Sequence, residues 1–405
     1  MSSLLKPRLA AMMFLEYAIW GSWYVTVNTY LTSTLHFTGT QAGAAFGTTA
    51  VGALVSPFFV GLVADRFFAT ERVLAVLYAI GALCMLGLMH VTGFGAVYGL
   101  LLLFCLCFFT SIALTNSITM QQVADPGRDF PPIRTAGTLG WIAINLIVGA
   151  MHVEAGTTPF LLAAALCAVM CLFSLTALPH TPPRARGQRV SARSILGLDA
   201  LAMMKNRDYL IFVIASVLAC IPLTFYYSFT NAYLNDVGVV NAAGKMTLGQ
   251  MSEVVMLMAM PLVFRVLSMR HILVLGLGAW VLRYGLLAHG DAGAGMWMFY
   301  AAILLHGVCY DFFFVSGQLY TDQEAPAHLR NTAQGFITLV TYGAGMLIGS
   351  FLSGGVLDYF STTAGGVVTY DWLHFWLTSA AGSLAILLLV LFFFRSSTKI
   401  KTAAR

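Results

Sequence analysis

Three charged residues lie within otherwise apolar stretches of this chain, and their surroundings suggest ligand and proton chemistry. Glu253 stands in GQMSEVVMLMAM, Asp311 in LLHGVCYDFFFVSG and Arg134 in DFPPIRTAGTLGW. An ionisable side chain at the centre of a bilayer costs at least about 2.5 kcal/mol, and such residues usually face a partner or a watery cavity. These three residues are therefore candidates for a substrate and proton path.

The stretch that begins at Arg134 carries a polar and aromatic stripe. Arg134, Thr138 and Trp141 follow one another at i, i+4 and i+7, which places them on one helical face. A guanidinium, a hydroxyl and an indole on one face can hold a planar polar ligand by hydrogen bonds and stacking. The alternative is that Arg134 lies at the membrane surface and only snorkels. Spacing alone leaves both interpretations open.

A second stripe lies between residues 208 and 234. Thr224, Tyr227 and Asn231 are spaced i, i+3 and i+7, and Pro222 just before them predicts a kink with freed backbone carbonyls. This face either contacts a ligand or packs against neighbouring helices. We favour ligand contact for Thr224 and Tyr227.

Gln250 and Glu253 share a face, and two interpretations of the carboxylate are open. Glu253 either exchanges a proton inside a cavity or forms a structural ion pair, for instance with Arg283.

The next polar group, near residue 310, holds the second buried carboxyl group. His306 and Tyr310 share a face at i, i+4, and Asp311 lies about 100° around the helix from Tyr310. Burial disfavours the ionised form of a carboxyl group, so Asp311 is a candidate for proton binding and release. We favour Asp311 over His306 as the proton carrier, because a membrane histidine is more often a satisfied hydrogen-bonding group.

The elements that must position these residues are membrane-spanning helices. Of the 405 residues, 59% are hydrophobic, and the mean hydropathy is +0.83, which predicts an all-α integral membrane protein. Apolar windows of helix length predict twelve spans. They cover residues 9–31, 41–64, 73–92, 96–122, 132–153, 159–178, 208–234, 246–268, 272–289, 296–320, 331–356 and 372–394.

The basic residues predict the orientation of these spans. With an even number of spans both termini lie on one side, and 19 of the 21 Lys and Arg residues then fall on that side. The exceptions are Lys245, on the other side, and Arg283, within a span. The positive-inside rule makes that side, and both termini, cytoplasmic. The net charge of +5 reflects this topology and does not indicate nucleic-acid binding.

Sequence motifs for cofactor chemistry are absent. The chain has no GxGxxG, Walker loop, zinc-ligand spacing or nucleophile elbow, so neither ATP nor a metal is expected. The seven cysteines lie in apolar spans without CxxC pairs, as small core residues do. We therefore expect no enzyme activity and no cofactor other than protons as the coupling ion.

One polar connection divides the chain into equal sets of spans. Residues 179–207 are rich in Pro and Arg, so we expect six-helix bundles at 1–178 and 208–405, joined by a cytoplasmic linker. This is the layout of the major facilitator fold, with substrate held at the midplane. The loop GLVADRFFATERV also resembles the loop motif of that superfamily, in which Asp65 and Arg66 would gate the cytoplasmic side.

Over nearly its whole length the chain resembles the nucleoside:H+ symporter family of the major facilitator superfamily. The segments that carry this resemblance are FLEYAIWGSWYVT (14–26), DFPPIRTAGTLGW (129–141), LGLDALAMMKN (196–206), AWVLRYGLLAHGD (279–291) and YDFFFVSGQLY (310–320). The resemblance implies proton-driven nucleoside uptake by a monomer in the lipid bilayer. Position by position, the substrate-binding residues of the family fall on Arg134, Thr138, Trp141, Gln250, Glu253, Tyr310 and Asp311.

The chain departs from the family pattern at three positions. Thr224 and Tyr227 stand where amide side chains are expected, and His306 replaces an expected tyrosine. Because amides read the edge of a base, these positions concern the choice of substrate.

We thus predict a symporter in which Glu253 and Asp311 bind polar substrate groups and at least one of them carries the proton. The alternatives are a symporter for a nucleobase or a sugar, a multidrug exporter, and a membrane sensor that transports nothing.

Overall fold

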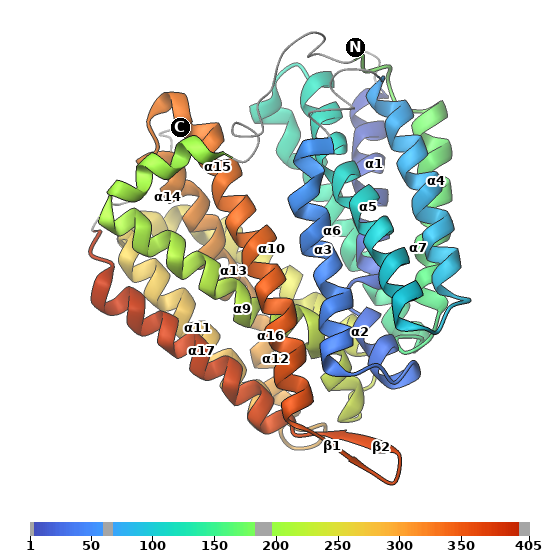
Figure 1. The fold of residues 1–405 in the computed structure, drawn as a ribbon. Coiled ribbons are helices and arrows are strands. Elements are labelled where there is room, and N and C mark those ends of the chain that lie inside the picture. The colour runs from blue at the N-terminus through green and yellow to red at the C-terminus, as the bar shows by residue number, and fades with distance from the viewer. Residues whose placement is uncertain (1–3, 60–67, 183–196, 397–405) are drawn as a thin grey trace. The chain divides into compact units, whose positions relative to one another are not determined.

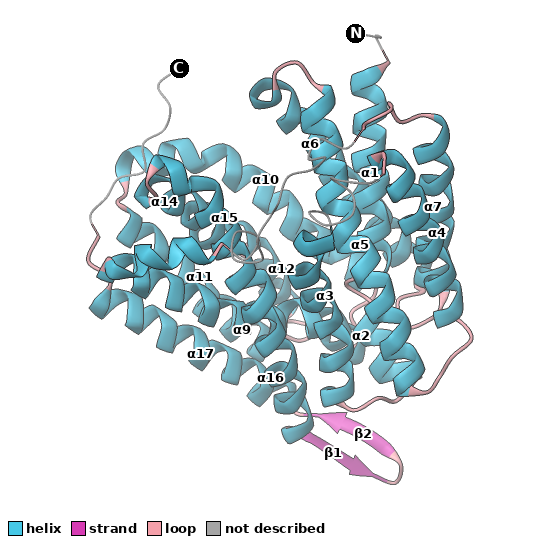
Figure 2. Cartoon of the chain, turned by 45° about the horizontal axis from the view of Figure 1, so that its top comes forward, coloured by secondary structure: helices cyan, strands magenta, loops and turns pink. Residues whose placement is uncertain are grey.

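The computed structural model describes residues 4–59, 68–182 and 197–396, and these are almost entirely helical. Figure 2 shows helices throughout, with one pair of strands in the part of the chain that the structure describes. The prediction of an all-α fold is confirmed. The chain forms two compact units: Met1–Phe37 with Ala44–Ile195, and Thr38–Gly43 with Leu196–Arg405.

The first unit consists of long helices joined by short connections (Figure 1). Its elements are α1 (Leu5–Trp23), α2 (Val27–Thr29), the π-helical turn η1 (Tyr30–Thr34), α3 (Gly39–Phe59, whose first turn clusters with the second unit), α4 (Thr70–Leu88), α5 (Phe94–Gln122), α6 (Pro126–Met151) and α7 (Thr158–Thr176).

The second unit contains more interrupted helices. Its elements are the 3-10 helix η3 (Leu198–Lys205), α9 (Arg207–Asp236), α10 (Ala242–Val266), α11 (Met269–His289), α12 (Met296–Leu304), α13 (His306–Tyr310), η4 (Asp311–Val315), α14 (Ser316–Glu324), η5 (Ala327–Leu329), α15 (Arg330–Thr338), η6 (Leu339–Gly345), α16 (Met346–Tyr359), β1 (Ser361–Ala364), β2 (Val367–Tyr370) and α17 (Trp372–Phe393). The strands pair antiparallel, with Ser361 opposite Tyr370, in a hairpin between α16 and α17 (Figure 1).

Polar side chains mark where the long helices begin. The carboxylate of Asp125 accepts a hydrogen bond from the backbone N–H of Arg128 at the start of α6, and the side chain of Asn206 caps α9 in the same way. Asp371 caps α17, where the backbone N–H of His374 lowers the pKa of this exposed carboxyl group. Each cap satisfies a backbone donor that the helix itself leaves unpaired.

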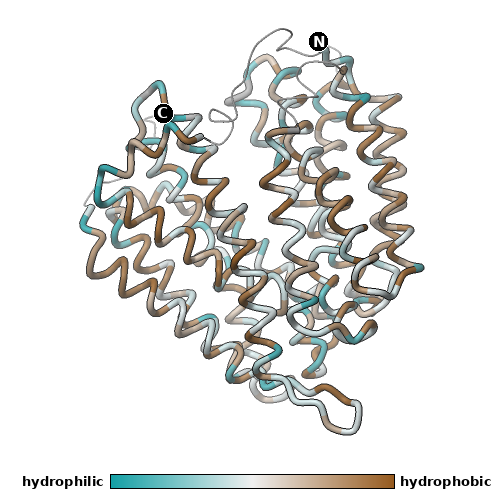
Figure 3. Tube along the Cα trace, viewed as in Figure 1, coloured by the Kyte–Doolittle hydropathy of each residue, from teal (hydrophilic) through white to brown (hydrophobic). Residues whose placement is uncertain are grey.

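Ten helical segments in the described residues are long and apolar enough to cross a membrane. They correspond to the third to twelfth predicted spans, and α1 and α3 occupy the first two. Figure 3 shows apolar stretches along the long helices. Large side chains such as Leu172, Leu282 and Leu384 are exposed on the helix surfaces, where lipid rather than water would cover them.

Three predicted spans are not uniform α-helices. In the span predicted at 9–31, α1 ends at Trp23 and is followed by α2 and η1. The span predicted at 296–320 contains α12, α13 and the π-helical turn η4, and the span predicted at 331–356 contains η6. Apolar periodicity does not report a single widened turn, because the flanking turns keep the α-helical period.

Candidate functional site

Asp311 is a fully buried carboxyl group at the first position of η4. It has 0% exposure, and neither carboxylate oxygen has a hydrogen-bond partner among the described residues. The hydroxyl of Ser316 donates to its backbone carbonyl at 3.2 Å. An ionised carboxylate without partners costs several kcal/mol in such a place. Its negative charge must therefore be removed by protonation or compensated by a ligand, by water or by a group that a conformational change brings near. Widened helical turns are frequent at functional sites.

Glycine residues bring α13 into close contact with α10. A Cβ atom at Gly307 would lie 2.5 Å from the backbone oxygen of Ser252, so only glycine fits there. This approach places Nε2 of His306 3.8 Å from Oε2 of Glu253. The Glu253 side chain is 30% exposed, whereas that of His306 is 1% exposed. Glu253 is therefore the member of this pair that a ligand can reach.

Aromatic rings enclose His306. Its ring stacks against Tyr226 at 5.5 Å and against Tyr310 at 5.7 Å, with interplanar angles of 23° and 26°. The hydroxyl of Tyr227 lies 3.5 Å from Nε2, and the hydroxyl of Tyr310 bonds that of Tyr342 in η6. The result is a rigid aromatic wall with several hydroxyl groups.

A buried cation completes this cluster. Arg283 of α11 is 1% exposed, its guanidinium carbon lies 3.3 Å from the centre of the Tyr226 ring, and Nη1 lies 3.0 Å from Nδ1 of His306. Within the described residues no carboxylate lies at ion-pair distance from this guanidinium. Arg283 is thus linked to Glu253 through His306 rather than by a direct ion pair.

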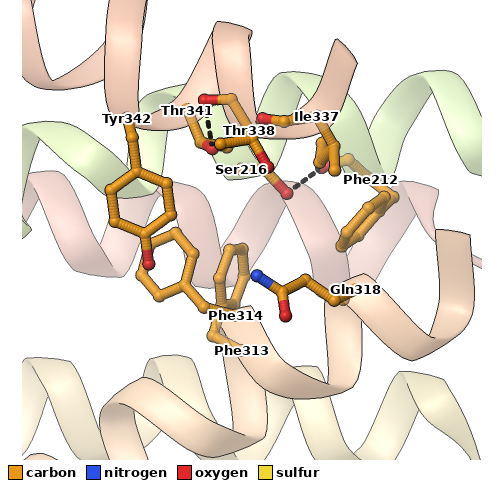
Figure 4. A pocket seen from close by; sticks show the side chains of 10 residues that line it. Phe212, Ser216, Phe313, Phe314, Gln318, Ile337, Thr338, Thr341 and Tyr342 are labelled. Atoms are coloured by element: carbon orange, nitrogen blue, oxygen red, sulfur yellow. Dashed lines mark hydrogen bonds between the residues drawn. The ribbon is translucent and has the colours of Figure 1, made fainter. Parts of the chain in front are cut away.

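The second unit also contains a narrow pocket beside this cluster (Figure 4). It extends from Tyr342 past Phe313 and Phe314 to Phe212, and Gln318 and Thr341 contribute polar groups. None of its lining residues is a predicted site residue, although Tyr342 connects it to Tyr310. The described residues contain no group of three or more side chains that could hold a metal ion.

In the first unit Arg134 has an aromatic partner. Its guanidinium carbon lies 3.9 Å from the centre of the Tyr17 ring on α1. A Cβ atom at Gly140 would lie 2.1 Å from the backbone oxygen of Phe14, so this glycine allows α6 to contact α1 closely. Arg134 and Thr138 are both partly exposed on α6. The guanidinium of Arg134 is therefore in contact with an aromatic ring and still within reach of a ligand.

Trp141 lies one turn beyond Thr138, in an aromatic cluster. Its ring makes edge contacts with Trp20 at 5.3 Å and Tyr24 at 5.7 Å. The predicted stripe of Arg134, Thr138 and Trp141 therefore continues into the aromatic residues of α1.

Another buried carboxyl group lies deeper in this unit. Glu16 of α1 has 0% exposure and contacts Tyr78 of α4 and Ser111 of α5. The Ser111 hydroxyl lies 2.9 Å from Oε1, and the Tyr78 hydroxyl donates to Oε2. Glu16 connects three helices.

Comparison with known proteins identifies the family. Residues 3–399 match the family model described as nucleoside H+ symporter. The chain belongs to the nucleoside H+ symporter family. This confirms the resemblance found in the sequence, and it places the chain among transporters rather than enzymes.

Relatives in this family are similar over nearly their full lengths. YegT of Escherichia coli strain K12, provisionally named a nucleoside transporter, is 38% identical over 98% of this chain and 96% of its own. The xanthosine permease of the same organism is 31% identical over 96% and 94% of the two chains, and nucleoside permease NupG is 30% identical over 94% of each.

Solved structures agree with this assignment. A crystal structure of the nucleoside transporter NupG superposes with a TM-score of 0.89 and 30% identity, over 98% of this chain and all of that one. A peptide transporter with 15% identity and a TM-score of 0.74 shares the fold alone. The predicted major facilitator fold is confirmed.

In this member of the nucleoside H+ symporter family, several of the predicted site residues lie close together. In the second unit, Tyr227, Glu253, His306 and Tyr310 form one cluster. Gln250 lies one turn before Glu253 on α10 and is partly exposed.

The roles predicted for Thr224 and for the gating pair stay predictions. Thr224 is fully buried on α9, where its hydroxyl donates to the Cys220 carbonyl at 2.7 Å and lies 3.4 Å from the sulfur of Met346. Asp65 and Arg66, the predicted gating pair, lie outside the described residues.

Sequence reasoning missed the partners of the buried charges. It connected Arg283 with Glu253 and not with His306, and it assigned no role to Glu16. A polar residue in an apolar span signals burial, but its partner lies on another helix, as Tyr78 does, 62 positions from Glu16.

Proposed function

We propose that this chain is a proton-coupled symporter that imports nucleosides across the inner membrane by alternating access. It would act as a monomer with both termini in the cytoplasm. The observation that carries the proposal is Asp311, a buried carboxyl group without a hydrogen-bond partner among the described residues, in a family of nucleoside H+ symporters. The names of two relatives, xanthosine permease and nucleoside permease, support a nucleoside as substrate.

Asp311 is the proposed proton carrier. Its charge has no compensation in the described residues, so protonation removes a large energetic penalty. Glu253 is partly exposed and lies beside His306, which suits a group that accepts hydrogen bonds from ribose hydroxyls. Gln250, on the same face, would assist Glu253.

The remaining predicted residues would contribute further contacts to the nucleoside. Arg134 and Thr138 would donate hydrogen bonds from α6, and Trp141, Tyr227 and Tyr310 would offer aromatic faces to the base. Thr224 and His306 depart from the family pattern, so we assign them to substrate preference: His306 through the cluster around Glu253, and Thr224 through packing of α9. Asp65 and Arg66 would gate the cytoplasmic side.

Uptake into proteoliposomes tests the proposal. The purified chain should accumulate labelled uridine or adenosine when the outside is made acidic, and a protonophore should abolish the accumulation. Empty liposomes serve as the control. Uptake that is unaffected by both the pH gradient and the protonophore would show that protons are not the coupling ion.

Competition separates the alternative substrates. Unlabelled nucleosides should displace the labelled one, whereas free ribose and free nucleobases should not. Displacement by a nucleobase or by a sugar alone would instead identify a symporter for that smaller solute, the second candidate that the polar cluster around Glu253 can accommodate.

A further inference from the structure

Arg283 is a buried cation in contact with the ring of His306. Its Nη1 atom lies 3.0 Å from Nδ1 of His306, while Nε and Nη2 have no hydrogen-bond partner there. Its guanidinium carbon lies 3.3 Å from the centre of the Tyr226 ring. An arginine at 1% exposure in a membrane helix is costly, so this contact calls for a functional explanation.

The contact determines where the imidazole hydrogen lies. A guanidinium has only donors, so Nδ1 of His306 must be the acceptor. The ring hydrogen of a neutral imidazole is then on Nε2. A second hydrogen on Nδ1 would face an N–H group of Arg283, so the doubly protonated ring does not fit this geometry.

The ring is also held against rotation. Tyr226 and Tyr310 both stack against it, with ring centres at 5.5 and 5.7 Å from its own. Nε2 is thereby directed toward the hydroxyl of Tyr227, at 3.5 Å, and Oε2 of Glu253, at 3.8 Å. The hydrogen on Nε2 consequently points at the groups that we assign to substrate binding.

We propose that Arg283 is a positioning residue that fixes His306 as a permanent Nε2–H donor toward Tyr227 and Glu253. This proposal rests on the proposed function of the Glu253 site. His306 then orients the Glu253 carboxylate and does not carry the coupling proton. Arg283 acts on substrate affinity through His306, without contact with the substrate.

Nitrogen NMR tests the tautomer independently of transport. In protein labelled with 15N-histidine, the two ring nitrogens have different shifts in each tautomer, and the spectrum of H306Q assigns the signals of His306. We expect the Nε2–H form in the wild type and a mixture of tautomers in R283M. A wild-type signal from the Nδ1–H form or from the imidazolium would overturn the proposal.

Transport kinetics test the coupling between the two residues. A glutamine amide can place its nitrogen near the position of Nε2, whereas an asparagine reaches only the position of Nδ1. We therefore expect H306Q to keep KM within about threefold, and H306N and R283M each to raise KM about tenfold, with kcat little changed. R283K should recover part of the affinity, because lysine can also donate to Nδ1.

The double variant decides whether Arg283 acts through His306. R283M should add no further loss in the H306Q background, because the donor at the Nε2 position then no longer depends on Arg283. R265M, at an exposed arginine near the end of α10, is the matched control. If R283M is equally damaging in both backgrounds, or if R283K is as damaging as R283M, the positioning role is wrong. A wild type without nucleoside uptake would refute the proposed function, while the NMR result would still decide the tautomer.

Discussion

Glu16 in the first unit and Asp311 in the second are equally buried, but their surroundings differ. Both have 0% exposure. Glu16 contacts the hydroxyls of Tyr78 and Ser111, whereas Asp311 has no hydrogen-bond partner among the described residues. Burial alone therefore does not identify a functional carboxyl group in a membrane protein. The hydrogen-bond partners distinguish the two cases. A carboxyl group whose hydrogen bonds are satisfied stabilises the fold, whereas one without partners can bind a proton or a ligand.

The hydrogen bonds around Glu16 explain why this residue is suited to a structural role. The single hydrogen of the Ser111 hydroxyl lies between the Phe108 carbonyl, at 2.7 Å, and Oε1 of Glu16, at 2.9 Å. If Ser111 donates to Phe108, it can accept a hydrogen bond from position 16. A glutamine amide there would donate to Ser111 and accept from Tyr78, so it would reproduce both contacts.

The substitution D311N should have the largest effect. Asparagine keeps the shape of the side chain but cannot bind and release a proton, so accumulation should stop and the ratio of internal to external nucleoside should fall to about one. The measurement is concentrative uptake of labelled uridine under an inward proton gradient.

The variant E16Q is the matched control, because it makes the same chemical change at another carboxyl group with 0% exposure. Counterflow exchange should survive in D311N, which shows that the protein still folds and binds. Concentrative uptake by D311N would remove Asp311 from the coupling mechanism.

The substitution E16L should lower the free energy of unfolding by about 2 kcal/mol, because it leaves the buried hydroxyl of Tyr78 without an acceptor. Thermal unfolding in detergent, followed by intrinsic fluorescence, measures this change. The double variant E16L/Y78F removes that unpaired hydroxyl and should recover part of the loss. No recovery would mean that the Tyr78 contact contributes nothing to stability.

The substitution E16Q should have the smallest effect. We expect the free energy of unfolding to change by less than about 0.5 kcal/mol, since the amide can satisfy the same partners. The pH profile of nucleoside uptake should match that of the wild type. A shifted profile would make Glu16 a second proton site and would end the distinction between the two carboxyl groups.

The sequence predicted the fold and family, because helix-length apolar windows and long specific segments such as DFPPIRTAGTLGW are local properties. It also selected Glu253, His306 and Tyr310, which lie together in the structure. It could not predict that His306 would lie between Arg283 and Glu253, since these residues come from three different elements. It could not separate Glu16 from Asp311 either, because Ser111 is 95 positions away from Glu16.

The π-helical turn that begins at Asp311 has a consequence for chain length. A π-helical turn contains one residue more than the corresponding α-helical turn. Deleting one residue from Asp311–Val315 would restore the regular α-helical hydrogen bonds, and the side chains of α13 and α14 would keep their directions. Deletion of Asp311 itself would therefore remove the carboxyl group without changing how α13 and α14 pack against their neighbours.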